Sequence, residues 1–172
     1  MRAILIALSL ALLAPTEGLA QTAWKTLSYP ELHMTISAPP GATPAVSHQT
    51  VPSAGKDVPM TSVALPLPQY GDAALQTLVA DFTGLGLTAD IDAAARGVVG
   101  AAPDATAVQV APISFQGGQG RDISLKTKGR FFRERLVVVG TRMYQMQAIS
   151  AVGAAEPLPE TERFLGGLTV TP

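Results

Sequence analysis

Cysteine is absent from the 172-residue chain. The protein therefore forms no disulfide, has no thiol nucleophile, and cannot build a zinc or iron–sulfur site on cysteine. Histidine is nearly as rare, with only His33 and His48, whereas a protein zinc site needs three or four ligands. These scarcities argue against a metal centre, and we expect the protein to work without a metal or an organic cofactor.

Charged residues are also scarce. They make up 15% of the chain, and the formal net charge is −1, so no overall field attracts the protein to nucleic acid. The chain lacks the GxxxxGK sequence of a phosphate-binding P-loop and the GxSxG turn of an α/β-hydrolase. We therefore expect a protein that is not an enzyme, and a hydrolase is the last of our three functional hypotheses.

The amino-terminal residues resemble a secretory signal peptide. Arg2 precedes an apolar run at residues 4–14, and small residues, Gly18 and Ala20, stand where a signal peptidase requires them. The alternative is a membrane anchor, but a spanning helix needs about 20 apolar residues. The pattern predicts a signal peptide at 1–20, a single mature domain at 21–172, and a periplasmic or extracellular location. Without a cysteine after the apolar run, we expect no lipid anchor and no stable membrane anchor.

Periodicity and turn residues predict an α+β fold, an antiparallel sheet of about six strands with two or three helices packed on its faces. Short, glycine-containing connections in the second half favour hairpins, because a parallel crossover needs a dozen residues or more. Helical spacing follows two aspartates, Asp72 and Asp90, which are suitable N-caps. The expected strands are 24–29, 32–38, 48–51, 60–67, 108–115, 121–126, 131–139, 143–149 and 168–170, and the expected helices are 73–82, 91–98 and 156–167.

The most unusual stretch is FQGGQGRD at residues 115–122, where three glycines fall within four positions. It lies between two expected strands, so a tight hairpin turn is favoured over a phosphate-binding loop. We expect Gly118 or Gly120 to adopt a positive φ. Arg121 and Asp122 are neighbours on a strand and should point to opposite faces. Arg121 is expected to hold turn carbonyls or an acidic side chain on an adjacent strand.

Basic residues are concentrated in one region. Seven of the eleven Lys and Arg residues after position 20 lie between 121 and 142. Arg133 and Arg135 are two apart on one expected strand and share a face. Together with Arg121 they are our candidate contacts for an anionic partner or lipid headgroup. The alternative interpretation is a solvated strand whose positive charges prevent edge-to-edge association.

The carboxy-terminal half resembles a family of exported bacterial proteins, the PsbP/DcrB-like class. The resemblance rests on ISFQGGQGRDISL, RFFRERLVVVGTRMYQMQAIS and TERFLGGLTV, which follow the patterns G-x-x-G-R-D/E, R-x-x-V/L-V-G-x-R-x-Y-x-M/L and F-L-x-x-L/F. It covers residues 107–170 well and 21–70 loosely. The resemblance implies an antiparallel sheet with helices on its faces. It also implies partner binding rather than catalysis, as for the photosystem II extrinsic subunit and a eukaryotic Ran-binding factor.

These observations together predict an exported, non-catalytic protein that binds another protein, not yet identified, or a component of the cell envelope. The second hypothesis is a small-molecule or anion-binding module that uses the basic strand at 130–135. A flat apolar patch beside that strand would favour the first hypothesis. A deep pocket with a convergent histidine and carboxylate would instead favour an enzyme.

The first testable prediction concerns export. The short apolar run and the Gly-Leu-Ala sequence before Gln21 predict cleavage at that bond. Intact-mass measurement of protein recovered from the periplasm or medium should therefore give an amino terminus at Gln21. Recovery of the full-length chain in the membrane fraction would contradict the signal-peptide interpretation.

Overall fold

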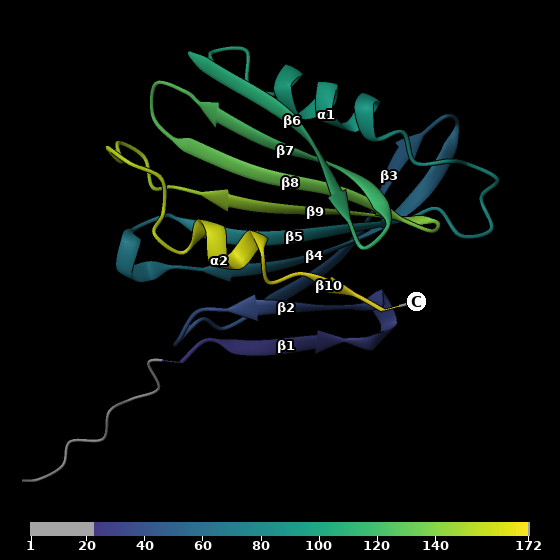
Figure 1. Cartoon of the computed structure of the whole chain (residues 1–172), viewed down its shortest axis with the longest axis horizontal. Coiled ribbons are helices and arrows are strands. Elements are labelled where there is room, and N and C mark those ends of the chain that lie inside the picture. Colours follow the sequence, from purple (N-terminus) through teal and green to yellow (C-terminus); the bar gives the residue numbers. More distant parts are fainter. Residues whose placement is uncertain (1–22, 172) are drawn as a thin grey trace, which may run out of the picture.

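Alternating apolar and polar residues build most of this chain into strands. The computed structural model describes residues 23–171. The predicted signal peptide and its cleavage site near Ala20 lie outside the described residues. Two antiparallel sheets and two α-helices make up the fold (Figure 1).

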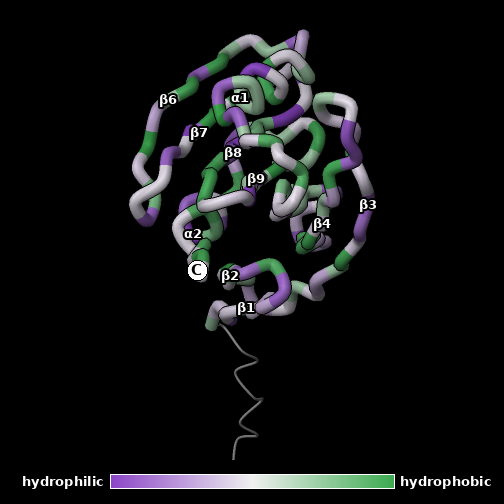
Figure 2. The backbone as a smooth tube through the Cα atoms, turned by 90° about the vertical axis from the view of Figure 1, so that its right-hand side faces the viewer, coloured by the Kyte–Doolittle hydropathy of each residue, from purple (hydrophilic) through white to green (hydrophobic). Residues whose placement is uncertain are grey.

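The main sheet has seven strands, all antiparallel to their neighbours. Their order across the sheet is β3-β4-β5-β9-β8-β7-β6. The strands are β3 (Ala45–Ser53), β4 (Lys56–Pro66), β5 (Ala74–Asp81), β6 (Ala107–Phe115), β7 (Gly118–Lys126), β8 (Phe131–Val139) and β9 (Arg142–Ile149). Strands β3 and β6 therefore form the two edges, which lie on opposite sides of the molecule in Figure 2.

A smaller sheet covers part of one face of the main sheet. It consists of β1 (Lys25–Tyr29), β2 (Met34–Ala38) and the carboxy-terminal β10 (Thr169–Val170), in the order β1-β2-β10. The short helix α2 (Thr161–Leu165) packs on the same side, which we call the α2 face. The core between these layers includes Met34, Ile36, Leu65, Tyr144, Met146 and Phe164, each no more than 1% exposed.

The opposite face of the main sheet, the α1 face, carries helix α1 (Ile91–Gly100). The Asp90 side chain caps this helix by accepting hydrogen bonds from the backbone N–H groups of Asp92 and Ala93. Ile91 and Ala95 pack against Ile123 and Leu136 of the sheet. Apolar burial therefore occurs on both faces, and each central strand presents side chains to two separate cores.

The expected fold class is confirmed, as is the run of four antiparallel strands that begins near residue 107. The main sheet has seven strands rather than about six, and two α-helices lie on its two faces. Helix α1 and its Asp90 cap agree with the prediction. Within residues 23–171, no helix combines the length and apolarity needed to cross a membrane.

The expected helix at 73–82 is wrong, because this segment is strand β5. Leu75, Thr77 and Val79 alternate onto the buried α2 face, while the intervening residues point to the α1 face. The apolar residues of this segment fit helical and strand spacing almost equally well. Pairing on both sides, with β4 and β9, decides for the strand. Asp72 is not a helix cap here, but forms an ion pair with Arg130.

Two other expectations need correction. The expected strand at 48–51 is too short, because β3 and β4 form a long hairpin that turns at Ala54 and Gly55, both at positive φ. The closing helix is much shorter than 156–167 and covers only Thr161–Leu165. Pro157 and Pro159 explain the late start, since the residue before a proline avoids helical conformation.

Leu136 provides a test of the core beneath α1. Its side chain is fully buried, and Leu136→Ala should reduce the free energy of unfolding by about 2–5 kcal/mol, because it leaves a cavity. The half-buried Val138 lies on the same face, and Val138→Ala is the milder control. Urea denaturation measures both variants. A loss below about 1 kcal/mol for Leu136→Ala would contradict this packing.

Candidate partner-binding surface

The glycine-rich stretch is a tight hairpin turn between β6 and β7. Gln116 and Gly117 occupy the turn with φ of 45° and 80°, which are the paired positive values of a type I′ turn. The expected positive φ at Gly118 or Gly120 is therefore wrong. These two glycines are needed for space, because a Cβ on Gly118 would lie 2.4 Å from the Val138 carbonyl oxygen.

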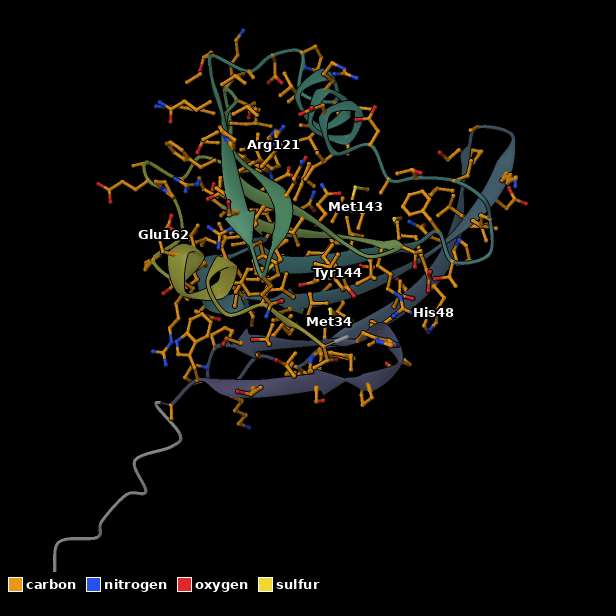
Figure 3. All side chains as sticks on the ribbon, turned by 45° about the vertical axis from the view of Figure 1, so that its right-hand side comes forward. Met34, His48, Arg121, Met143, Tyr144 and Glu162 are labelled. Carbon is orange, nitrogen blue, oxygen red and sulfur yellow. The ribbon has the colours of Figure 1, made fainter. Side chains whose placement is uncertain are left out.

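Arg121 attaches helix α1 to the sheet. Its Nε donates a hydrogen bond of 2.9 Å to Oδ1 of Asp92, in the first turn of α1, and its Nη1 donates one of 2.8 Å to the Gly120 carbonyl. The acidic partner comes from the helix rather than from an adjacent strand. Figure 3 shows Arg121 on the side of the sheet that carries α1. Most of the donors of Arg121 are thus directed at the protein itself.

Arg133 and Arg135 share the α2 face, as predicted, and so lie on the opposite side of the sheet from Arg121. Arg135 holds both carboxylate oxygens of Asp122 at 2.7 and 2.8 Å and donates to the Leu165 carbonyl at 2.9 Å. Arg133 pairs with Glu162 of α2 at 3.0 Å. The three candidate arginines therefore do not form one site. Any anionic ligand would have to compete with an acidic side chain at each of them.

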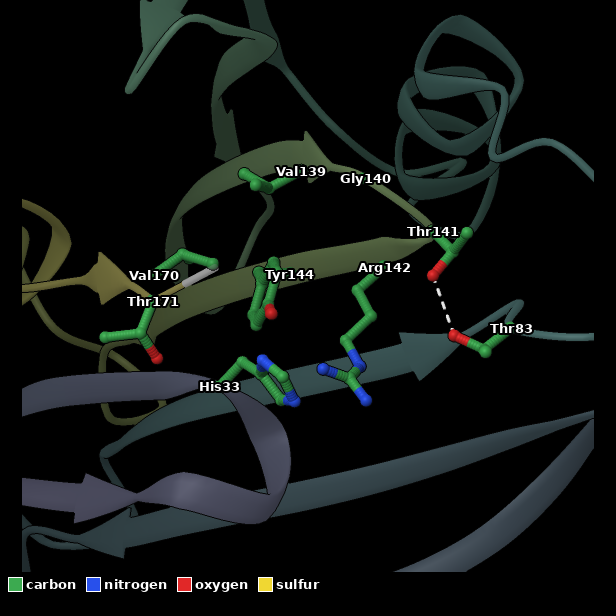
Figure 4. Close-up of a pocket in the computed structure, with 9 residues that line it drawn as sticks. All are labelled: His33, Thr83, Val139, Gly140, Thr141, Arg142, Tyr144, Val170 and Thr171. Carbon is green, nitrogen blue, oxygen red and sulfur yellow. Dashed lines mark hydrogen bonds between the residues drawn. The ribbon is translucent and has the colours of Figure 1, made fainter.

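A pocket of about 500 Å³ lies where the β8–β9 hairpin meets the smaller sheet (Figure 4). His33 and Arg142 border it, but the Arg142 guanidinium is held by Asp81 at 2.9 Å. The Tyr144 hydroxyl donates to the Leu32 carbonyl at 3.0 Å, and Thr83 and Thr141 hydrogen-bond to each other at 2.7 Å. The polar groups of this pocket therefore form hydrogen bonds between neighbouring segments of the protein.

His48 lies on the edge strand β3 and is not part of this pocket. Its Nδ1 is 3.0 Å from the Thr61 hydroxyl oxygen of the paired strand, and the side chain is exposed (Figure 3). Neither histidine contacts a carboxylate among the hydrogen bonds and ion pairs of residues 23–171. In that same range, no group of three His, Asp or Glu residues is arranged to hold a metal ion.

The edge strand β6 presents an uncharged surface next to α1. Residues 107–112 of this strand are all exposed, and the exposed fractions of Val108 and Val110 are 43% and 46%. Both valines border a groove of about 450 Å³ whose other wall is α1, including Ala95 and Val99. The outer backbone groups of an edge strand are free to pair with another chain. β6 thus combines open backbone groups, except at Pro112, which has no N–H, with a shallow groove that is apolar apart from Asp92 and Arg96.

Sequence reasoning did not identify this surface. The alternation in AVQVA predicted a strand, but it did not reveal that the strand lies at an edge or that α1 packs beside it. Pro112 within β6 was the available signal for an edge, because a proline in a strand is largely confined to edge strands and bulges.

No family model matches the chain, and no curated protein matches it. Among solved structures, the chain is similar to the solution structure of cyanobacterial PsbP (CyanoP) from Synechocystis sp. PCC 6803, with a TM-score of 0.53. The two sequences are 12% identical, and the match covers 92% of this chain and 98% of that one. The likeness establishes a PsbP-like fold over nearly the whole chain.

The turn glycines provide a second stability test. Gly117→Ala forces a side chain into a left-handed conformation and should cost about 1–2 kcal/mol. Gly118→Ala should cost more, because its Cβ would collide with backbone of the neighbouring strand β8. Thermal melts of the two variants and the wild type compare them directly. A Gly118→Ala variant as stable as the wild type would contradict the close approach of β7 and β8.

Proposed function

We propose that this chain is an exported, non-catalytic binding protein, and that the edge of β6 captures an extended segment of another protein. Export is supported by the signal-peptide pattern at residues 1–20, which favours a location in the periplasm or outside the cell. On the motifs within residues 107–170, we group the chain with the exported bacterial proteins of the DcrB-like class. The partner is then a protein of the cell envelope or periplasm.

The observation that carries this proposal is the open, uncharged edge of β6 beside the groove of α1. An extended peptide that adds to such an edge gains backbone hydrogen bonds, while alternate side chains supply specificity. Val108 and Val110 lie on the same face of the strand and border the groove. A partner segment with apolar residues at alternate positions fits this surface.

The other edge strand, β3, is a less suitable docking surface. It is also uncharged apart from His48, and Val46 is 48% exposed. Helix α1 and the last residues of β3 line a pocket of about 560 Å³, but Val46 is not among the residues that line it. Position 46, rather than β3 as a whole, therefore serves as an internal control for binding at β6.

Anion binding by the basic strand at 130–135 is the weaker alternative. Arg130, Arg133 and Arg135 already pair with Asp72, Glu162 and Asp122. An anion would have to displace these carboxylates, and this competition would weaken its binding. Hydrolysis is weaker still, because among the hydrogen bonds and ion pairs of residues 23–171 no acidic side chain orients the His48 imidazole beside Thr61.

Site-specific photo-crosslinking in cells of the source organism tests the proposal. Benzoylphenylalanine at position 110 should give a discrete adduct with one partner, whereas the same residue at position 46 should not. Peptide mapping should locate the adduct in an extended segment of the partner. Equal adducts at both positions, or none at position 110, would contradict docking at β6.

Lysine variants test whether formation of the crosslinked adduct depends on the edge of β6. Val108→Lys in the position-110 probe should weaken binding about tenfold, because a lysine on an edge strand opposes pairing. Val46→Lys is the matched control and should leave the adduct unchanged. Both valines are similarly exposed, so both variants should melt like the wild type. An undiminished adduct in the folded Val108→Lys variant would also contradict the proposal.

A further inference from the structure

Glu134 is a buried acid on the α1 face, near the middle of the main sheet. It is 4% exposed and lies directly across from Gln147 of β9. Gln145 and Gln147 each donate a side-chain hydrogen bond to Oε2, at 2.6 and 3.2 Å. Both hydrogen bonds therefore reach the same oxygen, and they leave Oε1 available to a further donor.

Glu134 differs from the other acids near the basic residues. Asp72, Asp81, Asp92, Asp122 and Glu162 each form an ion pair with an arginine. The arginines adjacent to Glu134 in the sequence point to the α2 face, because neighbours on a strand alternate. They cannot neutralise Glu134 through the sheet. A buried carboxylate without a cation is costly, and an acid of this kind that lines a pocket is a candidate binding residue.

Glu134 lines a pocket of about 350 Å³ between the sheet and the end of α1. Its walls are mostly apolar and include Val98, Ala102, Leu125, Phe132 and Ile149. Asp104 and Thr127 add polar groups, and no lysine, arginine or histidine lines it. The pocket thus has one carboxylate in its buried part, a second in its lining, and an aromatic ring beside them.

This chemistry selects a positively charged ligand. An ammonium group donates up to three hydrogen bonds, and such a bond is strengthened when both partners are charged. The face of Phe132 also favours a cation. Burial raises the pKa of Glu134, an effect that the two glutamine hydrogen bonds partly offset. A bound cation would compensate the same cost of desolvation.

We propose that this pocket binds a small organic cation, with its ammonium group on Glu134 and a short apolar body against Leu125 and Phe132. The proposal concerns a site separate from the β6 edge. The groove at β6 contacts residues of α1 such as Asp92 and Val99, whereas the Glu134 pocket contacts Val98 and the residues that follow the helix. The two sites can therefore be tested independently.

Hexylammonium is the probe for the first experiment. Calorimetric titration into the mature chain should give saturable binding, and amide chemical shifts should change mainly at residues lining the pocket. Hexanol has the same length without the charge and should bind at least about tenfold more weakly. Hexanoate should not bind, because its carboxylate would face Glu134 and Asp104.

Variants test the role assigned to each part of the pocket. Glu134→Gln keeps the shape but removes the charge and should lower the affinity for hexylammonium at least about tenfold. Its melting temperature should equal or exceed that of the wild type, because a buried charge is lost. Glu162→Gln removes the same charge on the α2 face and should leave the affinity unchanged. Ala102→Phe narrows the pocket with Glu134 intact and should also weaken binding.

Three results would overturn the proposal. They are an absence of saturable hexylammonium binding, equal binding of hexanol, and an unchanged affinity in Glu134→Gln. If Glu134→Gln fails to fold, the Ala102→Phe variant tests the proposal instead. An unchanged affinity for hexylammonium in that variant would also overturn it.

Discussion

The pairing of β5 with β9 holds the main sheet together. Every other pair of neighbours in that sheet joins strands that follow one another in the chain, as hairpins or short connections do. β5 and β9 are instead separated by α1 and three strands, and their eight paired positions run from Ala74 opposite Ile149 to Asp81 opposite Arg142. Closing so long a loop is entropically costly. Burial along this seam compensates for that cost, because Leu75, Val79, Tyr144 and Ala148 are all excluded from water.

Side chains of strand β9 make contacts on both faces of the sheet that depend on this pairing. On the α2 face, Tyr144 lies in the main core, and its hydroxyl donates a hydrogen bond to the carbonyl of Leu32, in the short 3-10 turn that joins β1 and β2 of the smaller sheet. On the α1 face, Gln145 and Gln147 supply the hydrogen bonds of Glu134. The smaller sheet and the glutamine pair therefore both depend on the position of β9. Loss of the β5–β9 seam would separate the sheet into two meanders and expose the cores on both sides.

Local features of this fold were predictable from the sequence, and the long-range seam was not. The strands from β6 to β9 follow one another through short turns, so alternation and glycine placement were sufficient to predict them. β5 was mistaken for a helix, because Leu75, Leu78, Val79 and Phe82 also match helical spacing. Only the strands that pair with this segment distinguish a strand from a helix here, and one of them, β9, lies more than sixty residues away in the chain. The grouping of Arg133 with Arg135 followed from spacing, but their acidic partners come from β7 and α2. Glu134 was not predicted as a site residue, because its burial depends on β9 and α1.

The alternation of β8 explains why charges are distributed so unequally between the two faces. Arg133 and Arg135 face α2, where Asp122 and Glu162 neutralise them, while Glu134 faces α1 without a cation. Helix α1 covers that second face, with the groove toward β6 on one side, a pocket toward the β3–β4 hairpin on the other, and the Glu134 pocket at its carboxy-terminal end. Ile91 and Ala95 bury the helix against β7 and β8, and Arg121 fixes its first turn through Asp92. The position of this helix therefore sets the width of the β6 groove and of the Glu134 pocket. The contacts that attach α1 to the sheet thus determine the shape of each proposed site.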